Sequence, residues 1–78
     1  GVSPRLPTLT GRDVIRALER GGFQVIRIKG SHHLLRHEVD PARQTVVPVH
    51  GSEDLGRPLM LKIIRDARLS VAEFAALL

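Results

Sequence analysis

The chain has 78 residues, of which 42% are hydrophobic, so it can form one small packed domain and is too apolar for wholesale disorder. It contains no cysteine, which excludes disulfides, thiolate zinc sites and a thiol nucleophile and fits a cytoplasmic protein. No apolar run approaches the roughly 20 residues that span a bilayer. The formal net charge of +4 comes mostly from arginine and favours a polyanionic partner, nucleic acid first, although an arginine-rich genome explains the charge equally well.

The chain is expected to begin with a flexible N-terminal tail over residues 1–9 and to form a single domain over residues 10–78. The domain opens with a helix at residues 11–20. Thr10 can cap this helix, and Asp13 suits the positive end of its dipole. Two glycines follow the last helical residue and end the helix, because glycine accepts a left-handed turn without strain.

Three short runs rich in β-branched residues then predict an antiparallel meander. Residues 23–29 form the first strand, residues 32–39 the second and residues 44–49 the third. Gly30-Ser31 makes a tight corner, and the short connections favour antiparallel neighbours. Pro48 has no N–H to donate to a ladder, so the third strand lies at a sheet edge or ends there.

The last third of the chain predicts two helices. Pro58 suits the first position of the longer one, whose apolar stripe repeats at helical spacing. Ser70 and Glu73 form a capping box that opens a short final helix reaching Leu78. The order is α-β-β-β-α plus a short C-terminal helix, with both long helices on one face of a three-stranded antiparallel sheet. This α+β layout is that of double-stranded-RNA-binding domains.

Two short motifs resemble a known family. Residues 29–33 read Lys-Gly-Ser-His-His, and residues 47–50 read Val-Pro-Val-His. Further matching positions are Gly22-Phe23, Arg27, residues 59–70 and Glu73-Phe74. Together they resemble the HicA toxin family, also called YcfA-like, of HicAB toxin–antitoxin modules. The resemblance runs from about Thr10 to the C-terminus, and the two motifs at this separation form a fairly specific pattern.

The resemblance implies a double-stranded-RNA-binding-like fold and a toxin of a type II toxin–antitoxin system. Such a toxin cleaves mRNA without a metal or other cofactor and is neutralised by a cognate HicB-like antitoxin. The resemblance also implies that a histidine of the first motif is the essential residue. That role falls on His32, with His33 as its neighbour, and a register in which His33 is the active one stays open. The two side chains face opposite sides of the sheet, because side chains alternate along a strand.

The chain departs from the family pattern in the second long helix. Arg57-Pro58 stands where the family usually has Gly-Thr before a leucine. Ala67-Arg68-Leu69 stands where the family usually ends the helix with Ala-Gly-Leu. A left-handed turn suits Arg68 poorly, so we expect strain at this end of the helix. The histidine motif is unaffected by these departures.

RNA cleavage of this kind begins with attack of the 2′-hydroxyl on the adjacent phosphate. It needs a base that works near neutral pH, and imidazole, with an ordinary pKa of about 6.5, is suited to that task. Lys29 and the backbone N–H groups of Gly30 and Ser31 can hold the phosphate. Further RNA contacts are expected from Arg27, Arg36, His50, Lys62 and Arg65.

Plainer interpretations stand beside these. A histidine at a strand edge is often only a surface residue, Ser31 suits an ordinary turn, and the basic row on the second long helix fits a solvated face. A metal site is disfavoured, because His33 and His37 would lie about 13 Å apart on a strand and no carboxylate cluster completes a ligand set. Two other functions stay open: a non-catalytic module that binds structured RNA, and a decayed toxin that still binds its antitoxin.

Overall fold

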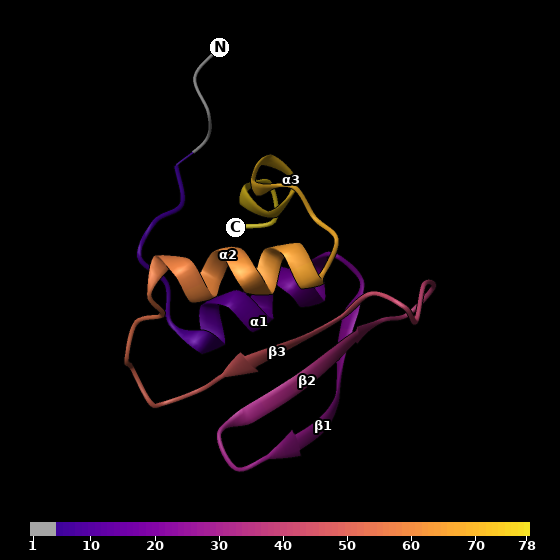
Figure 1. The fold of residues 1–78 in the computed structure, drawn as a ribbon, viewed down its shortest axis with the longest axis horizontal. Coiled ribbons are helices and arrows are strands. Elements are labelled where there is room, and N and C mark those ends of the chain that lie inside the picture. Colours follow the sequence, from indigo (N-terminus) through magenta and orange to yellow (C-terminus); the bar gives the residue numbers. More distant parts are fainter. Residues whose placement is uncertain (1–4) are drawn as a thin grey trace.

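The computed structural model describes residues 5–78, and Figure 1 shows all the helices on one side of a sheet. The helices are α1 (Gly11–Arg20), α2 (Arg57–Asp66) and α3 (Val71–Ala75). The strands are β1 (Phe23–Lys29), β2 (His32–His37) and β3 (Gln44–Pro48). They pair antiparallel in the order β1-β2-β3. This confirms the predicted α-β-β-β-α layout and its open antiparallel sheet.

The strand ends differ slightly from those predicted. β2 ends at His37 instead of residue 39, because His37 Nδ1 accepts the backbone N–H groups of Val39 at 3.2 Å and Asp40 at 3.1 Å. These two bonds hold the chain in a turn and take it out of the ladder. β3 ends at Pro48 instead of residue 49 and lies at a sheet edge, as expected for a residue without an N–H.

Both predicted N-terminal caps are present. Thr10 Oγ1 accepts the backbone N–H of Asp13 at 3.2 Å, and Asp13 Oδ2 accepts the backbone N–H of Thr10 at 3.0 Å. The Thr10 backbone N–H, and secondly its side chain, lower the pKa of Asp13 below its usual value. Ser70 and Glu73 form the same reciprocal pair at the start of α3, which ends at Ala75 and not at residue 78.

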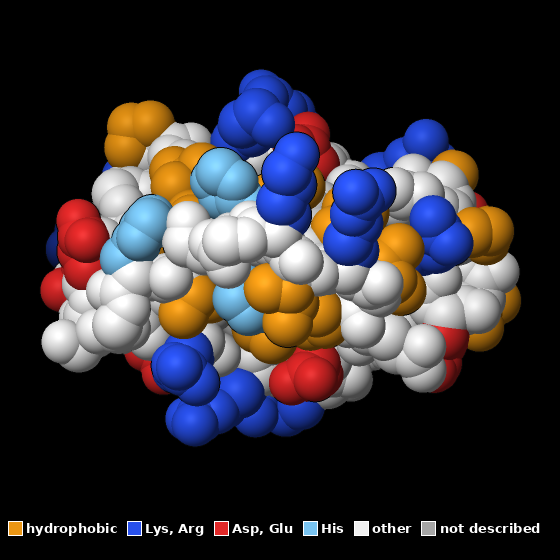
Figure 2. Space-filling model, turned by 90° about the horizontal axis from the view of Figure 1, so that it is seen from below, with side chains coloured by type: hydrophobic (Ala, Val, Ile, Leu, Met, Phe, Trp, Pro, Cys, Tyr) orange, Lys and Arg blue, Asp and Glu red, His pale blue; other side chains and the backbone are white. Residues whose placement is uncertain are grey.

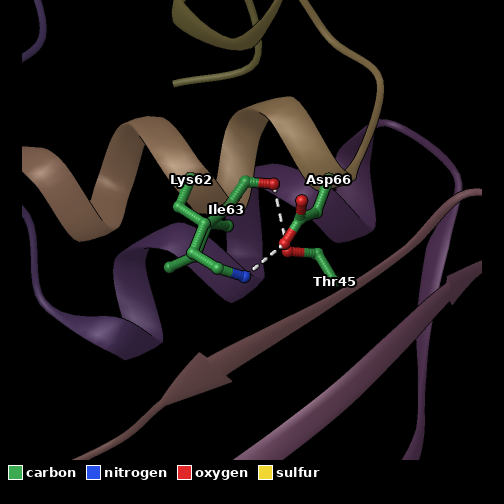
Figure 3. Close-up of polar contacts among 4 residues, drawn as sticks. All are labelled: Thr45, Lys62, Ile63 and Asp66. Carbon is green, nitrogen blue, oxygen red and sulfur yellow. Dashed lines mark hydrogen bonds and ion pairs between the residues drawn. The ribbon is translucent and has the colours of Figure 1, made fainter.

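The core lies between the helices and the helix-facing side of the sheet. Fully or almost fully buried side chains come from every element: Val14, Ala17, Leu18, Phe23, Leu35, Val47, Met60, Ile63, Ile64, Ala67 and Phe74. The buried Thr45 hydroxyl donates to the carbonyl of Ile63 at 3.0 Å and ties β3 to α2, as Figure 3 shows. None of the helices within residues 5–78 has both the length and the apolar character needed to cross a membrane.

The packed part of the chain begins before α1. Leu9 belongs to the core, and its carbonyl accepts the backbone N–H of Leu55 at 2.8 Å. Leu6 packs against the same core. Residues 5–9, which we assigned to the tail, therefore include core contacts. The tail prediction for residues 1–4 lies outside the described residues.

The start of α2 differs slightly from the prediction. α2 begins at Arg57, so Pro58 is its second residue and not its first.

The C-terminal end of α2 adopts the left-handed conformation that the departure at Arg68 suggested. Arg68 has a φ of +59°. The N–H of Leu69 donates to the carbonyl of Ile64 at 3.1 Å, and the N–H of Arg68 donates to the carbonyl of Arg65 at 2.9 Å. This is a Schellman motif with arginine at the position where glycine is preferred.

Arg68→Gly is therefore expected to stabilise the fold. Glycine adopts a positive φ without the steric cost of a Cβ, so the free energy of unfolding should rise by about 1 kcal/mol. Urea unfolding followed by circular dichroism measures this. Arg65→Gly is the matched control, because glycine within a helix costs about 1 kcal/mol. Destabilisation by both substitutions would show that Arg68 is not strained.

An unpredicted β-bulge lies in β1. Val25 pairs with Leu35 and Arg27 pairs with Leu34, so Ile26 is an extra residue in the ladder. The bulge shifts the alternation of every later residue in β1. Phe23 and Val25, before the bulge, face the helices, whereas Arg27 and Lys29, after it, face the other side of the sheet.

Candidate functional site

His32 and His33 point to opposite sides of the sheet, as strand alternation predicts. His32 pairs with Lys29 and Pro48 and is exposed, whereas His33 pairs with the fully buried Val47 and is half-buried. His33 therefore lies on the helix side of the sheet, and His32 lies on the open side. The two histidines of the motif belong to two different surfaces.

His33 lines a pocket of about 360 Å³ between α1 and the β1–β2 turn, the helix-side pocket. Its lining residues are Arg12, Ile15, Arg16, Glu19, Gly30, Ser31, His33 and Val49. Gly30 has a φ of +58°, which suits glycine and makes the predicted tight corner. Three residues of the first motif thus meet here, together with two arginines and one glutamate from α1.

The ring of His33 is oriented by the backbone. Its Nδ1 lies 3.1 Å from the carbonyl oxygen of Ser31. A carbonyl oxygen only accepts, so this hydrogen bond requires a proton on Nδ1, and the neutral ring then has an unprotonated Nε2. The same carbonyl accepts the N–H of Val49 at 2.8 Å, which fixes its position. A ring held in this tautomer has the arrangement of a general base.

His32 lines a different pocket of about 340 Å³, the loop pocket. Its lining residues are His32, Pro48, His50, Glu53, Asp54, Leu55, Gly56 and Leu59. The structure thus brings His32 of the first motif and His50 of the second motif into one pocket. Two carboxylates lie beside them and no arginine or lysine lines this pocket, so its charge is unfavourable for a phosphate.

The open sheet face carries polar and basic side chains from all three strands. Its members are Gln24, Arg27, Lys29, His32, Leu34, Arg36, Gln44 and Val46. Figure 2, a view from the sheet side, shows a row of basic side chains across this face, a second basic group near the lower margin, and acidic side chains toward the margins. Three predicted RNA contacts, Arg27, Lys29 and Arg36, therefore share one surface with His32.

Two further predicted contacts, Lys62 and Arg65, lie on α2. Lys62 Nζ is 2.8 Å from Asp66 Oδ2, one turn along the helix, as Figure 3 shows, so Asp66 offsets part of its charge. Arg65 is exposed on the same helix. α2 belongs to the helix layer, so these residues are separate from the open sheet face (Figure 1).

His37 has a structural role. Its Nδ1 accepts two backbone N–H groups, and its ring packs edge-to-face with the Phe23 ring, with centroids 5.1 Å apart.

Across residues 5–78, no three side chains of the histidine, aspartate or glutamate type come together in a way that could hold a metal ion.

Arg12 and Arg16 were not among the predicted site residues. The sequence places them on the polar side of α1, four residues apart, and a helix repeats every 3.6 residues, so they share one stripe. The sequence alone does not indicate which way this stripe points. In the structure it faces the β1–β2 turn and lines one pocket with His33.

Comparison with protein families reports a match to the family described as HicA toxin of bacterial toxin-antitoxin, over residues 11–69. The matched segment runs from the first residue of α1 to beyond the end of α2. It contains every lining residue of the helix-side pocket and of the loop pocket. The comparison with curated proteins gives no match.

Proposed function

We propose that this chain, which belongs to the HicA toxin family of bacterial toxin–antitoxin systems, is an endoribonuclease that cuts mRNA with His33 as the base. Membership of such a system gives the toxin an antitoxin as its partner. The observation that carries the catalytic proposal is the oriented ring of His33. Its Nδ1 is 3.1 Å from the Ser31 carbonyl, inside a pocket that also contains two arginines.

The reaction uses a nucleophile that the substrate supplies. Nε2 of His33 takes the proton of the RNA 2′-hydroxyl while O2′ bonds to the adjacent phosphorus. The P–O5′ bond breaks, and O5′ takes a proton from water. The products carry a 2′,3′-cyclic phosphate and a 5′-hydroxyl. No metal-activated water is required, and DNA is not a substrate because it lacks the 2′-hydroxyl.

His33 is a better base than His32 on physical grounds. His32 is exposed, and no hydrogen bond orients its ring within the described part of the chain. Glu53 and Asp54 share its pocket and repel a phosphate. We therefore assign the base to His33 instead of His32, the first choice from the sequence. His32 becomes an RNA-contacting residue beside Lys29.

The open sheet face supplies the sequence-tolerant part of RNA binding. Arg27, Lys29 and Arg36 are exposed there and hold backbone phosphates. Their contribution weakens with salt, because each neutralised phosphate releases counterions. His50 and Arg65 are secondary contacts, and Lys62 contributes less because Asp66 already pairs with it.

The antitoxin in this proposal is HicB-like and silences the toxin by covering one of two surfaces. Filling the helix-side pocket blocks the base directly. Covering the open sheet face blocks RNA binding, and an acidic antitoxin surface would complement its charge.

The test is a cleavage assay with purified protein in EDTA, on an RNA oligonucleotide and a DNA of the same sequence. We expect the RNA to be cut into fragments that end in 2′,3′-cyclic phosphates and the DNA to stay intact. RNA that binds without being cut would support the RNA-binding module instead. Cutting of both the RNA and the DNA, or cutting only when EDTA is omitted, would contradict the mechanism.

A further inference from the structure

The helix-side pocket contains two cations without an acidic partner. Arg12 and Arg16 line it from successive turns of α1, and both are exposed. Within residues 5–78, neither has a carboxylate oxygen within 4.0 Å. Glu19 is the one carboxylate in the pocket lining. The pocket is therefore basic, with two guanidinium groups free to bind an anion.

The nearest acidic residue in the first turn of α1 is already engaged. Asp13 Oδ2 accepts the backbone N–H of Thr10 at 3.0 Å and completes the helix cap. This capping role leaves Arg16 without a close ion pair, although its charge contributes to the lowered pKa of Asp13. A guanidinium group binds phosphate oxygens with two parallel N–H donors. Two such groups in one pocket therefore favour a phosphate ligand over an apolar one.

We infer that the helix-side pocket binds the scissile phosphodiester of the RNA, with Arg12 and Arg16 on its non-bridging oxygens and His33 facing the 2′-hydroxyl. The identity of the ligand as RNA rests on the proposed function. As O2′ attacks, negative charge grows on the non-bridging oxygens, and the two arginines stabilise it. They are therefore catalytic residues in this scheme, supplied by α1 and not by the histidine motif.

The cation within the sequence motif cannot take this role. Lys29 is adjacent to the turn in sequence, but its pairing with His32 places it on the open sheet face. His33 lies on the other side of the sheet, where its pairing partner Val47 is buried. Among the residues that line this pocket, the arginines come from α1, so that helix supplies the cationic side chains next to His33.

Three glutamine substitutions on one helix test the inference by cleavage. Arg12→Gln and Arg16→Gln should each lower the single-turnover rate at saturating RNA by about tenfold or more, because each removes a donor to the developing charge. Arg20→Gln removes the same charge one turn further along α1. Its side chain bonds to the carbonyl of Leu77 and does not line the pocket, so the rate should stay within about threefold. Arg16→Lys should recover part of the loss.

Phosphate binding tests the same site without cleavage. Inorganic phosphate added to the wild-type protein should shift the imidazole NMR signals of His33, assigned with His33→Gln, and leave those of His50 unchanged. The shift should disappear in the Arg12→Gln/Arg16→Gln double variant. Circular dichroism and thermal unfolding check that each variant is folded.

The two experiments separate the two proposals. If phosphate binds at His33 but the protein does not cut RNA, the phosphate site stands and the ribonuclease proposal is wrong. If all three glutamine variants still cut RNA at the wild-type rate, the ribonuclease proposal stands and the phosphate site is wrong. A phosphate shift at His50 in place of His33 also overturns it.

Discussion

Replacing His33 with alanine is expected to lower the rate of RNA cleavage by at least about a hundredfold, the usual contribution of a positioned general base. The loss should appear in the rate at saturating RNA and not in RNA affinity, because in the proposed mechanism the ring acts on the 2′-hydroxyl of bound RNA. The side chain is half-buried and is not part of the buried core, so the variant should fold.

His32→Ala is the matched control at the neighbouring position. It removes an exposed ring from the open sheet face and should weaken RNA affinity by less than about tenfold with little change in the saturated rate, as expected for one exposed contact. Single-turnover cleavage over a range of protein concentrations separates the two parameters. The assignment of the base to His33 would be wrong if His32→Ala abolished cleavage and His33→Ala did not.

Gly11→Ala should destabilise the fold by about 2 kcal/mol or more, because it forces overpacking against backbone that cannot move aside. A Cβ at Gly11 would overlap the carbonyl oxygen of Pro48 and come within 3.2 Å of Val49 Cα. The first turn of α1 therefore packs directly on the end of β3. Any separation of the two also moves Arg12 and Arg16 relative to His33, so cleavage should fall even in the molecules that stay folded.

Urea unfolding of Gly11→Ala and Gly56→Ala, side by side, measures this effect. A Cβ at Gly56 would meet only Pro58 Cδ at 3.9 Å, an ordinary contact, and its φ of −66° suits any residue. Gly56→Ala should therefore change stability by less than about 1 kcal/mol. Equal stability of the two variants would mean that α1 and β3 can move apart without a loss of stability.

Local signals in the sequence were sufficient for most of the fold. Thr10 and Asp13 identified the start of α1, and Pro48 identified an edge strand, although the strand ends one residue before the predicted end. Arg68 identified a strained helix end because its conformation depends on one position in one turn. The bulge was not predictable in this way. Ile26 is β-branched and apolar like Val25 and Ile28, and nothing in its chemistry indicates an extra residue in the ladder.

The candidate site was predictable only in part, for a related reason. The motif of residues 29–33 is contiguous, so its chemistry can be read directly. Its division between two surfaces follows from strand alternation, but the assignment of each histidine to a surface needs the sheet and the helices together. Arg12 and Arg16 reach His33 through the packing of α1 on the sheet, a long-range arrangement that no local pattern contains.

The single extra residue in β1 means that the charge distribution of the molecule does not depend on that residue being present. Deleting Ile26 would leave Val25 opposite Leu35 and Arg27 opposite Leu34, now in a regular ladder, so Arg27 and Lys29 would stay on the open sheet face. A deletion elsewhere in the strand would instead exchange the faces of the residues on one side of it. Alignments of related chains should therefore place a one-residue gap in β1 at Ile26, where it leaves the basic surface unchanged.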